Sequence, residues 1–404
     1  MSALLGDGLK PRDRALIEKV AKYYLDYYRI ITLRDLRTLL KTSERVKDEI
    51  NRQIRSKLLP LTLNELLDSI EHAERDRLVY REYAVDFDEN INGALHVPLT
   101  VAVCSTGLYA YITTKNTALA PAYSVLGALI NEMQIESQKF IEQDFDDIFE
   151  IRQQIIKMKE MLEAHLDEFP VGEIRRPRRY DPPWLVKALQ AYYAYREAAF
   201  GIKPGTGKEE ELYTIIKWKL YEILTFYLVL KTLSSHGYRV EFKAGKIEAA
   251  RGSDRYVLLF NMPPEGSTEI VKKVDELGDE IIESVKGKPD ISMSKNEKMV
   301  VFECKYSTSQ SYITAGRFKV LAYIYEFGLE SGVLVFPGIE NPNQEVDDEG
   351  TIRLAEETKN RGNILDLDLR DDGRKLYLLI LDPVDDTEKL QDLIERLFLS
   401  LKII

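Results

Sequence analysis

Two carboxylates and a lysine in the C-terminal half have the types and spacing of a hydrolytic metal site. Asp290 follows Pro289, and Glu303 and Lys305 stand thirteen and fifteen residues later, in the apolar run Met299 to Tyr306 that predicts a strand. Side chains alternate faces along a strand, so Glu303 and Lys305 share one face, and a short polar turn brings Asp290 back beside them. Paired carboxylates on a rigid sheet form a hard oxygen site that suits Mg²⁺ or Mn²⁺.

A divalent ion held there would support hydrolysis of a phosphodiester. It would polarise the phosphate, lower the pKa of a bound water and stabilise the charge that develops on the scissile group. Lys305, a compact cation, would orient that water or stabilise the pentavalent state. The alternative is a cross-strand ion pair without function, worth about 0–1 kcal/mol, because Glu-x-Lys pairs are common on strands.

Glu222 is a third carboxylate with an unusual setting. It is the one charged residue in the run Leu220 to Leu230, whose apolar residues have helical spacing. Burying a lone carboxylate there costs several kcal/mol unless a cation meets it. The cation is either a nearby lysine, Lys217 or Lys219, or the metal of the predicted hairpin, and the sequence leaves both open.

The elements that would position these residues form an α/β domain over 209–404, with a mixed sheet flanked by helices. Helices are predicted near 210–234, 268–285, 310–327 and 387–401, and strands near 238–242, 246–250, 256–260, 290–293, 299–306, 332–336, 364–369 and 376–381. The acidic stretch 340–372, with a net charge of −7, predicts a solvated loop.

The preceding half, residues 1–170, predicts a mainly helical module with a small β part, for recognition or partner binding. Helical spacing covers about 13–75 and 118–168, and short alternating runs, among them Val97 to Val103, predict strands between these segments. Prolines and glycines concentrate in residues 171–208, which predicts a connector and the domain boundary.

Composition limits the class of protein. The chain has 404 residues, 45% hydrophobic and 30% charged, with a net charge of −11, so it is globular and any contact to nucleic acid must be local. Two distant cysteines and four scattered histidines support neither a disulfide framework nor a zinc site. Without a signal pattern or an apolar stretch of about 20 residues, we expect a cytoplasmic protein with no membrane contact.

A helix with an embedded glutamate, a hairpin with Pro-Asp and Glu-Cys-Lys, and a following helix together resemble the PD-(D/E)xK nuclease superfamily. The resemblance implies a restriction-endonuclease-like fold and a Mg²⁺-dependent (or Mn²⁺-dependent) deoxyribonuclease. Asp290 and Glu303 would bind the metal, and Lys305 would be the catalytic lysine. Glu222 would be the auxiliary acidic residue of the first core helix, and Cys304 would assist the metal through its backbone carbonyl.

The following helix carries Arg317 and Lys319, where such nucleases place phosphate-contacting groups. Residues 205–404 are also similar to the McrC-type nucleases of modification-dependent restriction systems, which implies a AAA+ NTPase partner for the N-terminal half. The similar segments are Leu212 to Leu224, Lys319 to Tyr323 and Gly332 to Pro337.

Two segments reverse the overall negative charge: 286–322, with a net charge of +4, and 175–208, with +6 and interleaved tyrosines and a tryptophan. Arginines neutralise phosphates and aromatic rings stack on bases, so the second segment predicts a nucleic-acid contact. Packing of its tyrosines against the nuclease domain is the alternative. The basic cluster in it is Arg175, Arg176, Arg178 and Arg179.

The sequence therefore predicts a metal-dependent DNA endonuclease in restriction, defence or DNA processing. Its rivals are a catalytically silent DNA-binding scaffold with the same fold, and an adaptor subunit that acts only in complex with a AAA+ NTPase. Cutting both strands of a duplex usually needs two active sites, so a homodimer is a further hypothesis.

Overall fold

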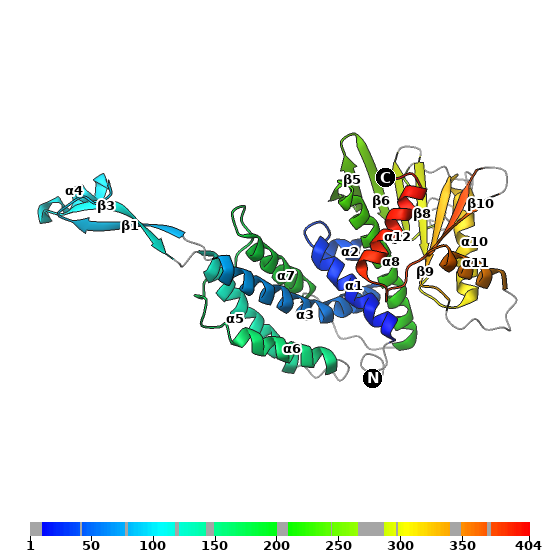
Figure 1. The fold of residues 1–404 in the computed structure, drawn as a ribbon, viewed down its shortest axis with the longest axis horizontal. Coiled ribbons are helices and arrows are strands. Elements are labelled where there is room, and N and C mark those ends of the chain that lie inside the picture. Colours follow the sequence, from blue (N-terminus) through cyan, green and yellow to red (C-terminus); the bar gives the residue numbers. More distant parts are fainter. Residues whose placement is uncertain are drawn as a thin grey trace, which may run out of the picture. The chain divides into compact units, whose positions relative to one another are not determined.

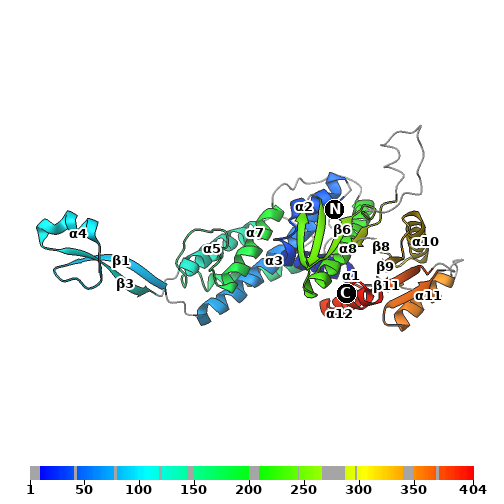
Figure 2. The same ribbon diagram turned by 90° about the horizontal axis from the view of Figure 1, so that it is seen from above.

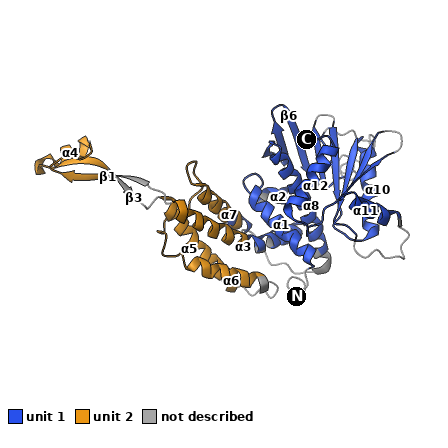
Figure 3. Cartoon of the chain, viewed as in Figure 1, with its two compact units in different colours: residues 1, 3–58, 196–404 blue, residues 2, 59–195 orange. Residues whose placement is uncertain are grey.

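The computed structural model describes residues 10–40, 43–76, 80–117, 121–142, 149–199, 209–243, 245–265, 287–295, 298–339, 349–369 and 373–404. The chain divides into two compact units: unit 1 contains residues 3–58 and 196–404, and unit 2 contains residues 59–195 (Figures 1 and 3). These units do not coincide with the predicted segments, because the first helices group with the C-terminal sheet and the connector is shared between the units.

A mixed sheet forms the centre of unit 1. Within the described residues its eight strands are β4 Arg239–Lys243, β5 Lys246–Arg251, β6 Asp254–Phe260, β7 Ile291–Lys295, β8 Lys298–Cys304, β9 Ser331–Phe336, β10 Ile364–Asp368 and β11 Lys375–Ile380. They lie in the order β10-β11-β9-β8-β7-β6-β5-β4. The pairs β8–β9 and β9–β11 are parallel and the other pairs antiparallel. The predicted strands are thus present, in a mixed sheet.

Helices flank this sheet. Those of unit 1 in the described residues are α1 Pro11–Tyr27, α2 Leu33–Leu39, α8 Glu209–Ser235, α10 Gln310–Glu326, α11 Glu349–Asn360 and α12 Thr387–Ser400; α3 Glu44–Asp76 begins in this unit. The helix α1 packs along α8 (Figures 1 and 2). The helix predicted near 268–285 lies outside the described residues. None of the described helices is both long and apolar enough to cross a membrane.

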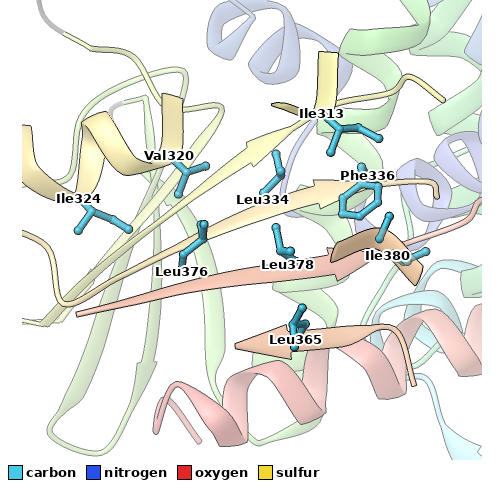
Figure 4. Close-up of a cluster of buried hydrophobic side chains, with 10 residues drawn as sticks. Ile313, Val320, Ile324, Leu334, Phe336, Leu365, Leu376, Leu378 and Ile380 are labelled. Carbon is cyan, nitrogen blue, oxygen red and sulfur yellow. The ribbon is translucent and has the colours of Figure 1, made fainter. Parts of the chain in front are cut away.

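The two faces of β8 meet different helices. Val301 packs with Tyr323 of α10, while the Cys304 thiol reaches Thr225 of α8. A larger apolar cluster fixes α10 and α11 on β9, β11 and β10 (Figure 4). Its buried members are Ile313, Val320, Ile324, Leu334, Phe336, Ala355, Leu365, Leu376, Leu378 and Ile380. The alternation along β8 thus sends Glu303 toward α10 and Cys304 toward α8.

The predicted solvated loop over 340–372 is wrong, because α11 and β10 lie within it. Thr351, Ala355 and Thr358 are buried at helical spacing, while Glu356 and Glu357 are exposed on the other face of α11. Glu356 and Glu357 therefore belong to the solvent side of an amphipathic helix, and Asp366 and Asp368 to β10, rather than to a loop.

Unit 2 contains α5 Pro121–Glu142, α6 Phe149–Glu163 and a small antiparallel sheet of β1 Tyr80–Asp88, β3 Tyr109–Thr117 and β2 Ala94–Leu95. The strand predicted at Val97 to Val103 is instead helix α4, Val97–Val103. The His96 ring accepts a hydrogen bond from the backbone N–H of Leu99 (3.3 Å). Pro98 stands in the first turn, where backbone N–H groups have no acceptor within the helix, so the N–H that proline lacks is not missed.

The predicted connector over 171–208 also contains a helix, α7 Pro183–Ala199. Pro183 is its first residue, so its missing N–H costs nothing there. Trp184, Leu185 and Leu189 are buried, and the Trp184 indole donates to Asp76 Oδ2 at 2.7 Å. The prolines therefore begin an ordered element rather than interrupt one.

Candidate functional site

Strand pairing brings the predicted acidic residues together at the ends of β6, β7 and β8. Continuing the antiparallel registers places Asn261 opposite Asp290 and Asp290 opposite Glu303. The backbone N–H of Asn261 donates to the Asp290 carbonyl at 2.9 Å, and the backbone N–H of Cys304 donates to Asp290 Oδ2 at 2.7 Å. Directly opposed residues share a face of the sheet, so the Asp290 and Glu303 side chains are neighbours.

Glu303 is fully buried, and its two oxygens are treated differently. Oε1 is 2.7 Å from Lys305 Nζ and 2.8 Å from Lys319 Nζ. Oε2 is buried and has no hydrogen-bond partner among the residues that the structure describes. Buried carboxylate oxygens are normally satisfied, so an incoming cation would find this one available.

Lys319 reaches the site from α10. It contacts the same Glu303 oxygen as Lys305, although it stands fourteen residues later in the sequence. Burial disfavours its charge, but the ion pair with Glu303 outweighs burial and raises the pKa of this lysine. Lys319 thus stays charged beside Glu303.

Asp290 is buried among negative charges. Burial, followed by the charges of Glu222 and Glu303, holds the pKa of its carboxyl well above the usual range, and the Cys304 N–H and Lys319 only partly oppose this. Such a carboxyl binds a proton unless another cation replaces it. Hard oxygen donors at Asp290 and at Glu303 Oε2 fit a Mg²⁺ or Mn²⁺ ion.

Glu222 has a lysine as its partner. Lys219 Nζ lies 2.8 Å from Glu222 Oε1 and 2.7 Å from Oε2, and also 3.2 Å from Asn261 Oδ1. Of the cations left open by the sequence, Lys219 is therefore the one that meets Glu222, and Lys217 pairs instead with Asp13 (3.2 Å). Burial raises the pKa of Glu222, Lys219 opposes the rise, and the charge of Glu303 adds to it.

Two residues that contact this region, Asn261 and Asp13, were not predicted from the sequence to belong to a site. Asn261 lies directly after β6 with φ of 54°, a left-handed conformation that asparagine tolerates better than most side chains. Asp13 of α1 accepts a hydrogen bond from the Tyr306 hydroxyl at 2.7 Å, across 293 residues of sequence. An asparagine at a strand end is a hint of a turn, but nothing in the sequence links Asp13 with the residue that follows Lys305.

The other predicted contact residues lie elsewhere. Arg317 lines a small pocket with Ile313 and Thr351, between α10 and α11, and its guanidinium lies 5.1 Å from the Phe318 ring centre. The Cys304 side chain is buried toward α8, and burial raises the pKa of its thiol. Lys319 is thus the member of the predicted pair that joins Glu303.

The arginine cluster of unit 2 separates into two roles. Arg175 forms a bidentate ion pair with Asp181, at 2.7 Å for each bond, and the Arg178 N–H donates to the same carboxylate at 2.6 Å. Arg176, Arg178 and Arg179 have exposed side chains, and Tyr180 is 90% exposed with Arg179 over its ring. Arg175 therefore braces a loop, and its neighbours carry the charge that the loop presents to solvent.

Comparison with known proteins gives a distant likeness to solved structures. No family model matches the chain, and no curated protein sequence matches it. Among solved structures, it is similar to a chain of a refined half-complex from a tetradecameric assembly of Thermococcus gammatolerans McrB AAA+ hexamers with bound McrC. The identity is 11% and the TM-score 0.38, over 98% of this chain and 78% of that chain. This likeness is too distant to place the chain in a family.

Proposed function

We propose that this chain is a metal-dependent endonuclease that hydrolyses phosphodiester bonds in DNA. The observation that carries the proposal is the asymmetric setting of Glu303, whose Oε1 is held by two lysines and whose Oε2 has no hydrogen-bond partner among the described residues. A purely structural buried ion pair needs its remaining lone pairs satisfied. Glu303 Oε2, without a described partner, lies next to Asp290, a second carboxyl whose pKa is raised by burial and by neighbouring negative charges. This arrangement favours binding of a cation from solution.

The side chains divide the chemistry between them. Asp290, Glu303 through Oε2 and the Cys304 carbonyl would hold the ion, which would supply polarisation of the phosphodiester and a bound water of lowered pKa. Lys305, kept 2.7 Å from Glu303 Oε1, would orient the attacking water. Lys319, on the same oxygen, would stabilise negative charge on the phosphate. Holding both lysines on one carboxylate oxygen keeps them ordered before the substrate arrives.

The fold supports the same proposal. The mixed sheet with α8 and α10 against opposite faces of β8 is compatible with the restriction-endonuclease-like architecture of PD-(D/E)xK nucleases. We extend the proposal to a role in restriction, defence or DNA processing, resting on the McrC-like segments of the sequence.

The test is cleavage of single-stranded, duplex, methylated and branched DNA, by wild type and Asp290→Ala, with Mg²⁺, Mn²⁺ or EDTA. We expect wild type to cleave at least one substrate, and both EDTA and the substitution to abolish cleavage. Activity that survives both would mean that the site is not the nuclease centre. Absence of cleavage together with absence of ion binding in a calorimetric titration would favour a silent DNA-binding scaffold.

Gly316→Ala is expected to slow cleavage by about tenfold, because small displacements of catalytic groups have effects of this order or larger. A Cβ on Gly316 would lie 2.7 Å from Lys305 Cγ and 2.8 Å from Leu334 Cδ1, so α10 or the lysine must shift. Binding of Ca²⁺, measured by calorimetry, should change little. Gly350→Ala is the matched control, since a Cβ there meets nothing within 4 Å; equal cleavage by the two variants would contradict this role of Gly316.

A second candidate is an adaptor whose nuclease acts only with a AAA+ NTPase. The observation that favours it is the apolar surface of the segment over 80–117, because exposed apolar patches mark interaction sites. The exposed apolar side chains there are Val85, Phe87, Ile91, Leu95, Val97, Leu99, Val101 and Tyr109. Purification of the chain from its native host should then yield an NTPase that stimulates cleavage, and Val97→Ser with Val101→Ser should weaken that association.

A further inference from the structure

The Lys219 ammonium bridges the two carboxylate oxygens of Glu222. Its ammonium lies within 2.8 Å of both carboxylate oxygens, and the third contact, to Asn261 Oδ1 at 3.2 Å, anchors it from the end of β6. Residues 219 and 222 stand three positions apart on α8, so the helix itself keeps them on one face. Both side chains are largely shielded from water, at 17% and 6% exposed. This pair is therefore a fixed part of the interior rather than a mobile surface contact.

The capacity to accept a further cation is distributed unevenly over the three buried carboxylates. The single Lys219 ammonium contacts both oxygens of Glu222, whereas Glu303 has two ammonium contacts on Oε1 and no described partner on Oε2. Asp290 lies between them, with a backbone N–H on Oδ2. The open acceptors thus lie on the Asp290 and Glu303 side of the site.

We propose that Lys219 is a built-in cation that keeps Glu222 out of metal coordination, so that the site takes one divalent ion rather than two. The inference rests on the proposed function and assigns its metal stoichiometry. A two-ion site requires carboxylates that serve both ions about 4 Å apart. A second ion near Glu222 would have to displace an ammonium that is itself held by Asn261.

The role of Lys219 follows from this placement. It is a positioning residue: it neutralises Glu222 without touching the predicted scissile phosphate, and it leaves Asp290 and Glu303 to a single ion. Removing its charge while keeping its length should free Glu222 and make the site one charge more negative. An ion would then find a third carboxylate beside Asp290.

The test is calorimetric titration of the full-length protein with Ca²⁺ and with Mn²⁺, in the absence of DNA. We expect one ion per wild-type chain, and two ions, or one bound about tenfold more tightly, for Lys219→Met. Glu222→Gln should leave the stoichiometry at one but weaken binding about tenfold, because it leaves the Lys219 ammonium without its compensating charge. Lys219→Met combined with Glu222→Gln should also return to one ion, and it removes the buried charge that threatens folding of the single variant.

Lys231→Met is the matched control, because it removes a lysine from the same helix beside the Tyr23 ring, outside the site. Two ions in wild type, a loss of affinity of tenfold or more in the charge-neutral variant Lys219→Met with Glu222→Gln, or wild-type titration curves for Lys219→Met would each overturn the inference. Failure of the proposed function has a different signature: no ion binds to wild type, and Glu303→Gln changes nothing.

Discussion

Glu303→Gln is expected to lower the rate of DNA cleavage by at least about 10³-fold and to remove divalent-ion binding, since a metal and its ordered partners contribute several kcal/mol to the transition state. The substitution keeps the shape of the side chain but removes the charge that Lys305 and Lys319 share at Oε1. It also converts the carboxylate to an amide, so that an NH₂ group takes the place of Oε1 or Oε2. Both halves of the proposed chemistry therefore fail together. The measurement is single-turnover cleavage alongside calorimetric titration with Ca²⁺.

The control for this substitution is Glu248→Gln on β5, in the same sheet. Glu248 pairs with Arg255 and has no contact with the site residues among those described. It should retain wild-type cleavage and ion binding. If Glu303→Gln still bound Ca²⁺ with wild-type affinity and unfolded at the wild-type temperature, Glu303 would not be a metal ligand, even if cleavage had fallen.

Asp13→Ala is expected to lower the free energy of unfolding of unit 1 by about 3 kcal/mol, the range for breaking a buried charged hydrogen-bond network. Asp13 is buried and accepts from the Tyr306 hydroxyl at 2.7 Å and from Lys217 at 3.2 Å. Burial and the charge of Asp13 raise the pKa of Tyr306, so the hydroxyl keeps its proton and remains a donor. Truncation leaves that donor without its acceptor and removes the ion pair between Asp13 and Lys217.

Denaturation in urea measures this loss, and Glu18→Ala is its matched control, an exposed acidic residue of the same helix. Glu18→Ala should change stability by less than about 0.5 kcal/mol. Because Tyr306 follows Lys305 directly, cleavage by Asp13→Ala should also fall, and Asp13→Asn, which keeps an acceptor for Tyr306, should recover part of it. Equal stability of Asp13→Ala and Glu18→Ala would contradict a structural role of α1 in unit 1.

Local chemistry along the chain was sufficient for the hairpin of β7 and β8 and for the helix that carries Glu222. A period of two in an apolar run defines a strand and places Glu303 and Lys305 on one face, and a short polar turn sets which run lies beside it. The buried position of Glu222 followed from its apolar neighbours on the same helix. These are properties of residues a few positions apart, and they hold whatever the rest of the chain does.

Two of the errors arose at the starts of helices. The segment Val97 to Val103 reads as a strand by its β-branched residues, yet the His96 cap and Pro98 begin helix α4 there. The prolines before α7 were interpreted as breakers, although the first turn of a helix accommodates them. The residues at a helix start compete with the propensities of the residues that follow. In both segments, the residues at the start favour a helix, and a helix forms.

Tertiary structure alone decided which partners the charged residues have. Periodicity gives the face on which a side chain lies, but not what lies opposite: Lys319 reaches Glu303 because an apolar cluster fixes α10 on the sheet, and Asn261 enters because β6 pairs with β7. The choice of Lys219 over a metal for Glu222, and of Asp13 for Tyr306, likewise depends on packing between distant segments. The sequence by itself determined that Glu222 is buried and that its charge requires compensation. Which group compensates it depends on the distant side chains that the folded core brings within about 3 Å.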